Sequence, residues 1–302
     1  MNRYEFEFLS YIAEHNGEEY NQRGVSDDIC ISGTQVKNSY EKALSEGNII
    51  ERKTDKIIVE ITPSGLEALE PYRVKRAVIL AAGFGSRMMP ATADRPKPLV
   101  SVNGRKIIET LIDSLIDAGV EDITIIRGYH KEKFDDLLER YPGLRLIDND
   151  IYDSTNNISS AIAALDYFKD GCYLCEADLY ITNPKVIKKY QYASNILGSF
   201  SLETDDWSYR LKDGYITDYK KGNTYCYNYY GISYWTPEDC VKLCEDWTES
   251  FKTEEGRDVF WEQIPLQLKA DRYNVEVRIC NKSDIIEIDN YYELQMLDSS
   301  YK

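Results

Sequence analysis

Hydrophobic and polar positions divide the first 72 residues into short segments of helical and strand spacing. Apolar residues recur every three or four positions in residues 4–13 and 33–46, which predicts two amphipathic helices, and Gly47 ends the second one. Residues 49–52 and 57–61 predict two strands joined by residues 53–56. A further helix begins at Pro63, with Thr62 as its N-cap. This region is therefore expected to hold helices, a two-stranded hairpin and a closing helix.

A charged linker over residues 70–76 separates this region from a longer one in which strands and helices alternate. The predicted strands are residues 77–81, 122–126, 144–147, 172–175 and 286–289. The predicted helices are residues 106–118, a helix from residue 131, residues 158–168, and segments near residues 237–247 and 259–268. Such alternation is typical of a mainly parallel sheet with helices on both faces. We predict two domains: residues 1–72, and an α/β, Rossmann-like domain with a mixed, mainly parallel sheet over residues 73–302.

The small region resembles the MarR-type winged helix-turn-helix family, both in the order of its elements and in the pattern of residues 44–66. The resemblance implies a recognition helix and a wing that carries Arg52, Lys53 and Lys56. Residues 1–72 nevertheless hold seven Lys or Arg against fourteen Asp or Glu, and phosphate contacts dominate DNA affinity. DNA binding stays open but is not favoured over a protein-binding, regulatory or homodimerising role.

The overall composition narrows the class of protein. The chain of 302 residues has a formal net charge of −16, which does not attract nucleic acid through its overall field. This acidity suits a cationic substrate or a divalent metal, or serves solubility alone. The apolar runs are shorter than the ~20 residues of a membrane span, and the first residues lack a signal-peptide core. Neither membrane insertion nor secretion is expected.

The seven cysteines include Cys172 and Cys175, which have the spacing of a zinc or redox pair. No second Cys-x-x-Cys pair occurs in the sequence, and the chain has only two histidines. Both cysteines lie in an apolar run that predicts a strand, so we interpret them as buried core thiols. A reducing, cytoplasmic location fits this use of cysteine.

A glycine-rich turn follows the first strand of the α/β region. Gly83 and Gly85 allow the backbone to approach an anion closely, while Arg87 and Lys97 add cationic donors for a polyphosphate. The turn is not a Walker loop, because no Gly-Lys-Ser/Thr follows, and Met88 stands where a dinucleotide loop has its third glycine. The segment therefore predicts a phosphate site of another kind.

Residues 80–90, followed by Pro96-Lys97-Pro98-Leu99, resemble the N-terminal motif of nucleotidyltransferases that make nucleoside-diphosphate sugars and alcohols. In that family the glycine loop and its arginine wrap the triphosphate, and the lysine touches the nucleotide phosphates. The resemblance extends over residues 76–300 and implies the fold of a nucleotidyltransferase domain. The nucleotide contacts that it implies are Leu80, Ala82, Gly83, Gly85, Ser86, Arg87 and Lys97.

A second motif indicates a subfamily. Residues 149–160, with Asn149, Asn156-Asn157 and Ser160, resemble the corresponding segment of bacterial CTP:phosphocholine cytidylyltransferases. Asn157 and Ser160 offer the donors and acceptors that a pyrimidine edge requires. The alternative is that Asn156 or Asn157 only caps the helix expected from residue 158.

Two carboxylates end predicted strands. Asp178 follows the strand at 172–175, and Asp289 ends the strand at 286–289. The carboxyl ends of parallel strands are where α/β proteins bind ligands. The resemblance implies that both aspartates are magnesium ligands, and Mg²⁺ accepts one or two carboxylates together with phosphate oxygens and waters. Each aspartate alone would equally suit a helix cap, but together with the glycine loop they lead us to expect Mg²⁺ as the cofactor.

The resemblance also implies an acceptor site between these two aspartates in the sequence. Lys220 and Lys221 both stand where the family has its acceptor-phosphate lysine; the choice is open, and Lys221 is the candidate carried forward. A choline head has no N–H group to donate, so aromatic faces and carboxylates must hold it. The candidates are Trp207, Tyr234, Trp235 and Trp261 as aromatic faces and Asp258 and Glu287 as counter-charges. The alternative is that these aromatic residues only pack in the core.

The resemblance implies transfer of CMP from CTP to phosphocholine, which yields CDP-choline and pyrophosphate. Its catalytic residues would be Lys97, Arg87, Asp178 and Asp289. Alternative acceptors are 2-aminoethylphosphonate, phosphoethanolamine and a sugar 1-phosphate. An alternative of another class is a transcriptional regulator that senses a nucleotide without turnover, although such a sensor has no need of the whole metal set.

Overall fold

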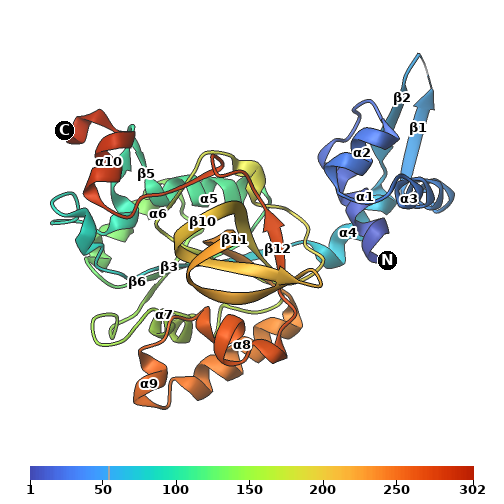
Figure 1. Cartoon of the computed structure of the whole chain (residues 1–302). Coiled ribbons are helices and arrows are strands. Elements are labelled where there is room, and N and C mark those ends of the chain that lie inside the picture. The colour runs from blue at the N-terminus through green and yellow to red at the C-terminus, as the bar shows by residue number, and fades with distance from the viewer. Residues whose placement is uncertain (54) are drawn as a thin grey trace. The chain divides into compact units, whose positions relative to one another are not determined.

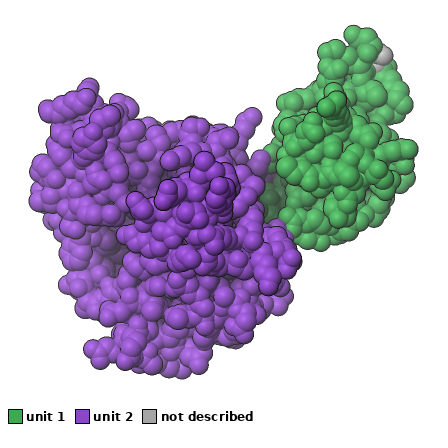
Figure 2. Space-filling view, in the orientation of Figure 1, with its two compact units in different colours: residues 1–73, 190–192 green, residues 74–189, 193–302 purple. Residues whose placement is uncertain are grey.

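The computed structural model describes residues 1–53 and 55–302, so Thr54, in the predicted hairpin turn, lies outside the described residues. The chain divides into two compact units (Figure 2). Unit 1 consists of Met1–Arg73 together with Tyr190–Tyr192, and unit 2 consists of Val74–Lys189 and Ala193–Lys302. Three residues from the middle of the chain thus belong to the first unit, which a single boundary drawn along the sequence does not include.

Unit 1 contains helices and one antiparallel hairpin, in the order that the hydrophobic pattern predicts (Figure 1). Side-chain caps define where the helices begin: Asn2, Asn21, Ser32 and Thr62 each accept a hydrogen bond from a backbone N–H of the following first turn. The elements are α1 (Arg3–Glu14), α2 (Gln22–Asp28), α3 (Gly33–Ser45), β1 (Ile49–Lys53), β2 (Ile57–Ile61) and α4 (Pro63–Leu69).

The core of unit 1 is completed by its late-sequence segment. Tyr190 is buried in the same cluster as residues of α1, α3 and α4. The Tyr192 ring stacks on Tyr72 with a centroid distance of 5.6 Å and lies 5.3 Å from the ring of Phe6. The backbone N–H of Gln191 donates to the carbonyl of Tyr72 at 2.9 Å. This segment is therefore part of the packing of unit 1.

The described residues of unit 2 build a seven-stranded sheet in the order β10-β12-β11-β8-β3-β6-β7 (Figure 1). Neighbouring strands among β8, β3, β6 and β7 are parallel, and β11 pairs with β8 in the antiparallel sense. The sheet is mixed and mostly parallel, as the alternation of elements predicts. Its strands are β3 (Arg76–Ala81), β6 (Asp122–Arg127), β7 (Arg145–Asp148), β8 (Cys172–Glu176), β10 (Asn195–Lys212), β11 (Tyr215–Trp235) and β12 (Glu276–Ile279).

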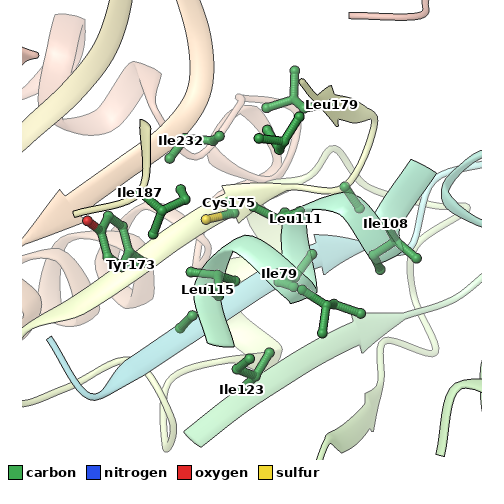
Figure 3. Close-up of a cluster of buried hydrophobic side chains, with 14 of the residues drawn as sticks. Ile79, Ile108, Leu111, Leu115, Ile123, Tyr173, Cys175, Leu179, Ile187 and Ile232 are labelled. Atoms are coloured by element: carbon green, nitrogen blue, oxygen red, sulfur yellow. The ribbon is translucent and has the colours of Figure 1, made fainter. Parts of the chain in front are cut away.

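Strand β3 is buried on both faces because helices cover both sides of the sheet. Ile79 points to one face and packs against α5 (Ile107–Asp117), where Figure 3 shows it beneath Leu111 and Leu115. Val78 points to the other face, toward α7 (Ile158–Ala163) and α8 (Pro237–Ser250). Full burial of an aliphatic side chain of this size contributes about 1.5–3 kcal/mol. The same central strand thus supports the core on both sides.

Cys172 and Cys175 alternate in the same way on β8 and enter opposite core clusters. Both thiols are fully buried and free, and burial raises the pKa of each. The interpretation of these residues as core thiols is confirmed.

Two predicted helices differ from the observed elements. α7 ends at Ala163 instead of continuing to residue 168. The helix expected over residues 259–268 is only a π-helical turn, Ile264–Leu268, which contains Pro265. A proline inside a helix has no N–H to donate, which disfavours a regular α-helix there.

The predicted strand near residue 286 lies outside the main sheet. β13 (Ile285–Glu287) pairs in the antiparallel sense with β9 (Leu179–Ile181), and Glu287 lies opposite Leu179. This pairing brings the chain around Asp289 next to Asp178, although the two residues are far apart in the sequence.

Smaller elements complete unit 2. They are β4 (Ser101–Val102), β5 (Arg105–Lys106), α6 (Leu137–Arg140), α9 (Glu254–Arg257) and α10 (Tyr291–Leu297). The helix expected from residue 131 begins as a 3₁₀ turn, Lys131–Asp136, and continues as α6. Within the described residues, every helix is too short or too polar to traverse a bilayer.

Candidate active site

A cavity of about 680 Å³ opens at the carboxyl ends of the parallel strands of unit 2. Its walls come from the glycine loop after β3, the segment 149–160 after β7 and the end of β8. β10, β11, the segment 260–262 and the segment 287–289 close the remaining sides. In open α/β sheets, ligands bind in this position.

The two glycines of the loop have different surroundings: Gly85 is closely packed, and Gly83 is not. Gly85 has a φ of +60°, and a Cβ on it would lie 2.7 Å from the Cβ of Lys97. The carbonyl of Gly85 accepts a hydrogen bond from Thr92 Oγ1 at 2.9 Å. The space around Gly83 is free within 4 Å among the described residues. The loop therefore needs glycine at 85 for its own geometry and leaves room for a ligand at 83.

Lys97 lies at the junction of two acidic segments. Its Nζ donates to Asp178 Oδ2 at 3.0 Å and to Asp289 Oδ1 at 3.3 Å. Burial opposes the charged form of Lys97, but the carboxylates of Asp178, Asp289 and Glu287 outweigh it and raise its pKa. Arg87 donates through both terminal nitrogens to Asp289, at 3.0 and 3.1 Å. Both predicted phosphate-binding cations thus lie beside the predicted metal ligands.

Three carboxylates gather at this junction. Oxygen atoms of Asp178, Glu287 and Asp289 all lie within 4.8 Å of one another. Burial and the neighbouring carboxylates raise the pKa of Glu287 to about 8. Asp178 Oδ1 is buried and has no hydrogen-bond partner among the described residues. Hard oxygen donors in this arrangement fit Mg²⁺, which takes carboxylate oxygens together with phosphate oxygens and waters.

The segment 149–160 supplies amide and hydroxyl groups to the cavity. Buried Asn149 donates to Ser159 Oγ at 2.9 Å and to Ser160 Oγ at 3.1 Å. Asn157 Oδ1 accepts a hydrogen bond from the backbone N–H of Trp261 at 2.8 Å. Its side chain makes no cap hydrogen bond to α7, so the alternative of a simple N-cap does not apply to Asn157.

The opposite part of the cavity combines aromatic rings with buried carboxylates. The Trp207 ring stacks on Tyr219 at a centroid distance of 5.0 Å, and the Tyr219 hydroxyl donates to Glu262 Oε1 at 3.2 Å. Burial raises the pKa of Glu262 to about 7. Glu262 Oε2 and the Tyr229 hydroxyl are buried without a hydrogen-bond partner among the described residues. Buried polar atoms normally find partners, so these two atoms indicate a polar ligand, and the carboxylate oxygen favours one that donates a hydrogen bond.

The two neighbouring lysines of β11 have different surroundings. Lys221 lines the cavity. Lys220 pairs with both carboxylate oxygens of Asp218, at 2.9 and 3.1 Å. Adjacent residues of a strand point to opposite sides, which explains why only one of the two lysines reaches the site.

Comparison with known proteins adds the family. Residues 77–195 match the MobA-like NTP transferase domain. A 2-aminoethylphosphonate cytidylyltransferase from Lancefieldella rimae is 38% identical over 228 residues, which cover 74% of this chain and 92% of the relative. The chain belongs to the MobA-like nucleotidyltransferase family.

Two further comparisons agree with this family assignment. The choline-phosphate cytidylyltransferase of Streptococcus pneumoniae is 31% identical over 238 residues, or 75% of this chain and 98% of the relative. The solved structure of the CTP:phosphocholine cytidylyltransferase from Streptococcus pneumoniae has a TM-score of 0.69 and 30% identity, and the similarity covers 76% of this chain and 100% of that chain. The mixed α/β nucleotidyltransferase fold expected from the sequence is confirmed. Part of this chain has no counterpart in these relatives.

The cavity of the nucleotidyltransferase brings together many of the residues singled out in the sequence. The nucleotide candidates on its wall are Leu80, Ala82, Gly83, Gly85, Ser86, Arg87, Lys97, Asn157 and Ser160. The metal and acceptor candidates on its wall are Asp178, Asp289, Glu287, Trp207 and Lys221. Glu287 lies with the two aspartates, so its place is the acidic cluster and not an aromatic cage.

The structure does not place four other acceptor candidates on the cavity wall. Tyr234, Trp235 and Trp261 are buried in the core and are absent from the cavity wall as the structure describes it. Trp235 donates from Nε1 to Ser233 Oγ at 2.8 Å and contacts Trp261 edge-on, so packing accounts for Trp235. The buried Nε1 of Trp261 has no hydrogen-bond partner among the described residues. Asp258 is exposed after α9 and likewise does not line the cavity. The position of a residue in a sequence motif does not show whether its side chain points into the cavity or into the core.

Several residues of the site escaped the sequence analysis. Glu262, Tyr229 and Phe260 line the cavity beside Trp207, and Tyr152 lines it beside Asn157. Glu176 also lies there; its carboxylate packs against Gly231, and desolvation raises its pKa well above the usual range. The sequence feature that could have identified some of these residues is a carboxylate within an otherwise apolar segment, as at Glu176 and Glu262.

Proposed function

We propose that this nucleotidyltransferase transfers CMP from CTP to a small phosphonate or phosphate that carries a primary ammonium group, with 2-aminoethylphosphonate as the leading acceptor. The carrying observation is the pair of buried, unpartnered acceptor atoms, Glu262 Oε2 and the Tyr229 hydroxyl, in the cavity that also holds the glycine loop. A primary ammonium can donate to both atoms, whereas a trimethylammonium group can donate to neither.

The reaction would be an in-line displacement at the α-phosphorus of CTP. An acceptor oxygen forms the new bond to this phosphorus, the bond to the bridging α–β oxygen breaks, and pyrophosphate leaves with its electron pair. The acceptor oxygen is already anionic near neutral pH, so the step needs no general base. Lys97 and Arg87 would hold the phosphates and balance their charge, which is the main contribution that a protein makes to such a transfer.

Asp178 and Asp289 would hold Mg²⁺, with Glu287 beside them. The unpartnered Asp178 Oδ1 and the crowding of three carboxylates support this assignment. When bound, the ion would neutralise charge on the triphosphate and the leaving pyrophosphate.

The acceptor would lie between Lys221 and Glu262. Lys221 lines the cavity, forms no ion pair within the part of the chain that the structure describes, and suits the acceptor phosphonate as a point charge. Trp207, Tyr229 and Glu262 surround the ammonium end, and the Tyr219 hydroxyl orients Glu262. The 38% identical relative named for 2-aminoethylphosphonate supports this choice of acceptor.

Phosphocholine is the second candidate, because the Trp207 ring offers the cavity an aromatic face. One such face contributes about 0.5–2 kcal/mol to binding of a quaternary ammonium. The aromatic cage expected for choline is reduced, however, since three of its four predicted members lie in the core.

The test is pyrophosphate release from CTP and Mg²⁺ with four acceptors in parallel: 2-aminoethylphosphonate, phosphoethanolamine, phosphocholine and glucose 1-phosphate. We expect the highest kcat/KM with a primary amine. Glu262→Gln should lower kcat/KM for primary amines by about tenfold or more, because an acceptor-only carboxylate is lost. Trp207→Ala should affect phosphocholine by roughly two- to thirtyfold and primary amines less.

A kcat/KM for phosphocholine well above that for 2-aminoethylphosphonate would show that aromatic recognition decides the acceptor. Absence of release from CTP with every acceptor, while another nucleoside triphosphate reacts, would contradict the assignment of CTP.

A further inference from the structure

Three aromatic rings join the loops that follow three adjacent parallel strands. Phe84 follows β3, Tyr129 follows β6 and Tyr152 follows β7. The ring centroid of Phe84 lies 5.2 Å from that of Tyr152 and 5.4 Å from that of Tyr129. Phe84 sits between Gly83 and Gly85, so this aromatic cluster connects the phosphate loop to the loop that carries Asn157.

The Tyr152 ring is held firmly in place. A Cβ on Gly128 would lie 2.7 Å from Tyr152 Cγ and 2.8 Å from its Cδ1, so the ring rests directly on the Gly128 backbone. Tyr129 is anchored in turn, because its N–H donates to the carbonyl of Ala82 at 3.1 Å and its hydroxyl donates to the carbonyl of Thr92 at 3.2 Å. Moving Tyr152 aside would separate it from Phe84 and uncover Gly128.

Tyr152 lines the cavity together with Asn149, Asn157 and Ser160. Tyr152 contacts Phe84 of the glycine loop, whereas Asn157 adjoins the segment that carries Glu262 through the N–H of Trp261. This wall therefore connects the regions that the proposed function assigns to the phosphates and to the acceptor. The Tyr152 ring restricts the space for a nucleobase on this wall.

We propose that Tyr152, held by Phe84 and Gly128, is a specificity-determining residue that limits the bound nucleobase to a single ring. The inference rests on the proposed function, since it assumes a nucleoside triphosphate in this cavity. It goes further by assigning the choice of pyrimidine over purine to an aromatic wall, in addition to any hydrogen bonds from Asn157 and Ser160. Phe84 acts through Tyr152 and is a positioning residue.

The test is nucleotide binding to the full chain in the presence of Mg²⁺ and without acceptor, measured by calorimetry with CTP and with ATP. Wild type is expected to prefer CTP. Tyr152→Ala should lower the ratio of CTP to ATP affinity by about tenfold or more, in the range that pocket size typically controls. Tyr152→Phe keeps the ring and should retain the preference.

Phe84→Ala provides a second route that leaves Tyr152 intact. It should lower the same ratio by a smaller factor, because the ring loses one support, while Phe84→Leu restores apolar volume and much of the preference. The proposal is overturned if wild type binds ATP as well as CTP, or if Tyr152→Ala weakens both nucleotides equally. A wild-type protein that binds neither nucleotide contradicts the proposed function itself, so the two failures are distinguishable.

Discussion

At the scale of single residues, the cations and carboxylates of the site are already paired with one another. Lys97 bridges Asp178 and Asp289, and Arg87 forms a two-nitrogen contact with Asp289. A triphosphate with its metal would exchange these partners, giving the carboxylates to the cation and the basic groups to the phosphates. In the structure, the charges of Lys97 and Arg87 balance those of Asp178 and Asp289.

Asp178→Asn and Asp289→Asn test the metal assignment. Each change keeps the shape of the side chain and removes one negative ligand, so kcat/KM should fall on the order of a hundredfold or more. Pyrophosphate release over a Mg²⁺ series is the measurement. Asp94→Asn is the matched control, because Asp94 is exposed and pairs with Arg95 away from the cavity wall. Wild-type turnover by both site variants would remove these residues from the mechanism.

The lysine pair of β11 gives an internal comparison. Lys221→Ala should raise the acceptor KM by roughly tenfold or more and leave the KM for CTP nearly unchanged, since hydrogen bonds to charged groups are worth this much. Lys220→Ala should leave both constants unchanged, because Lys220 pairs with Asp218 outside the site. Steady-state kinetics with varied acceptor decides, and equal effects of the two variants would contradict the assignment.

Glu262 should make acceptor binding depend on pH. Burial raises its pKa to about 7, so the carboxyl is neutral below this value and negative above it. An ammonium group binds the negative form better, and the acceptor KM should therefore fall as the pH rises from about 6 to about 8. Glu262→Gln cannot titrate at this position, so the part of the pH dependence that comes from this carboxyl should disappear. Identical pH profiles of the variant and the wild type would exclude this role.

At the scale of elements, the buried carboxylate of Asp246 links α8 to the segment that follows the π-helical turn. Asp246 on α8 is fully buried and accepts hydrogen bonds from Lys269 Nζ at 2.9 Å, from Arg272 and from the Tyr273 hydroxyl. The turn contains Pro265, which has no N–H to donate. The hydrogen bonds and ion pairs of Asp246 add contacts between α8 and the segment after this turn.

Asp246→Asn should therefore destabilise unit 2 strongly. Hydrogen bonds to a buried charged group typically contribute about 1.5–3 kcal/mol, and Asn keeps only part of them, while Lys269 and Arg272 remain partly exposed. Urea denaturation followed by fluorescence gives the free energy of unfolding. Glu249→Gln, an exposed partner of the same Lys269, should have little effect. Equal and small losses in both variants would show that the network does not hold the segment.

At the scale of the whole molecule, unit 1 carries no excess of free positive charge. All seven of its Lys and Arg residues up to residue 72 form ion pairs with Asp or Glu within the described residues, including Arg52 with Glu60, Lys53 with Glu51 and Lys56 with Glu19. DNA binding through a winged helix would need these groups for phosphates. Together with the excess of acidic residues in residues 1–72, this pairing agrees with the expectation that unit 1 serves protein binding, homodimerisation or regulation.

A chain that begins at Val74 tests whether unit 2 works alone. Unit 2 has its own core on both faces of the sheet, so the shortened chain should fold and keep its kcat/KM within roughly twofold. Tyr190 and Tyr192 would lose their partners in unit 1, and replacing both by Ser in the shortened chain should prevent aggregation. Activity and thermal unfolding are the measurements. A well-folded but inactive chain would show that unit 1 is needed for catalysis.

Local chemistry in the sequence determined the part of the cavity that we assign to the nucleotide. The glycine loop, Arg87 and Lys97 are close in the chain, and the φ of +60° at Gly85 is a local requirement that the residue type reveals. The alternation of elements similarly predicted the mostly parallel sheet, because periodicity reports which faces of each element are buried.

Only the tertiary structure decided the acceptor end and the composition of unit 1. Trp207, Lys221 and Glu262 come from separate segments, and the facing of β10 and β11 determines which of their side chains reach the cavity and which, like Trp235, enter the core. The Tyr190–Tyr192 segment joins unit 1 through packing against Phe6 and Tyr72. In both cases the deciding contacts link residues distant in the chain, and a pattern of polarity reports that a side chain is buried but not what it is buried against.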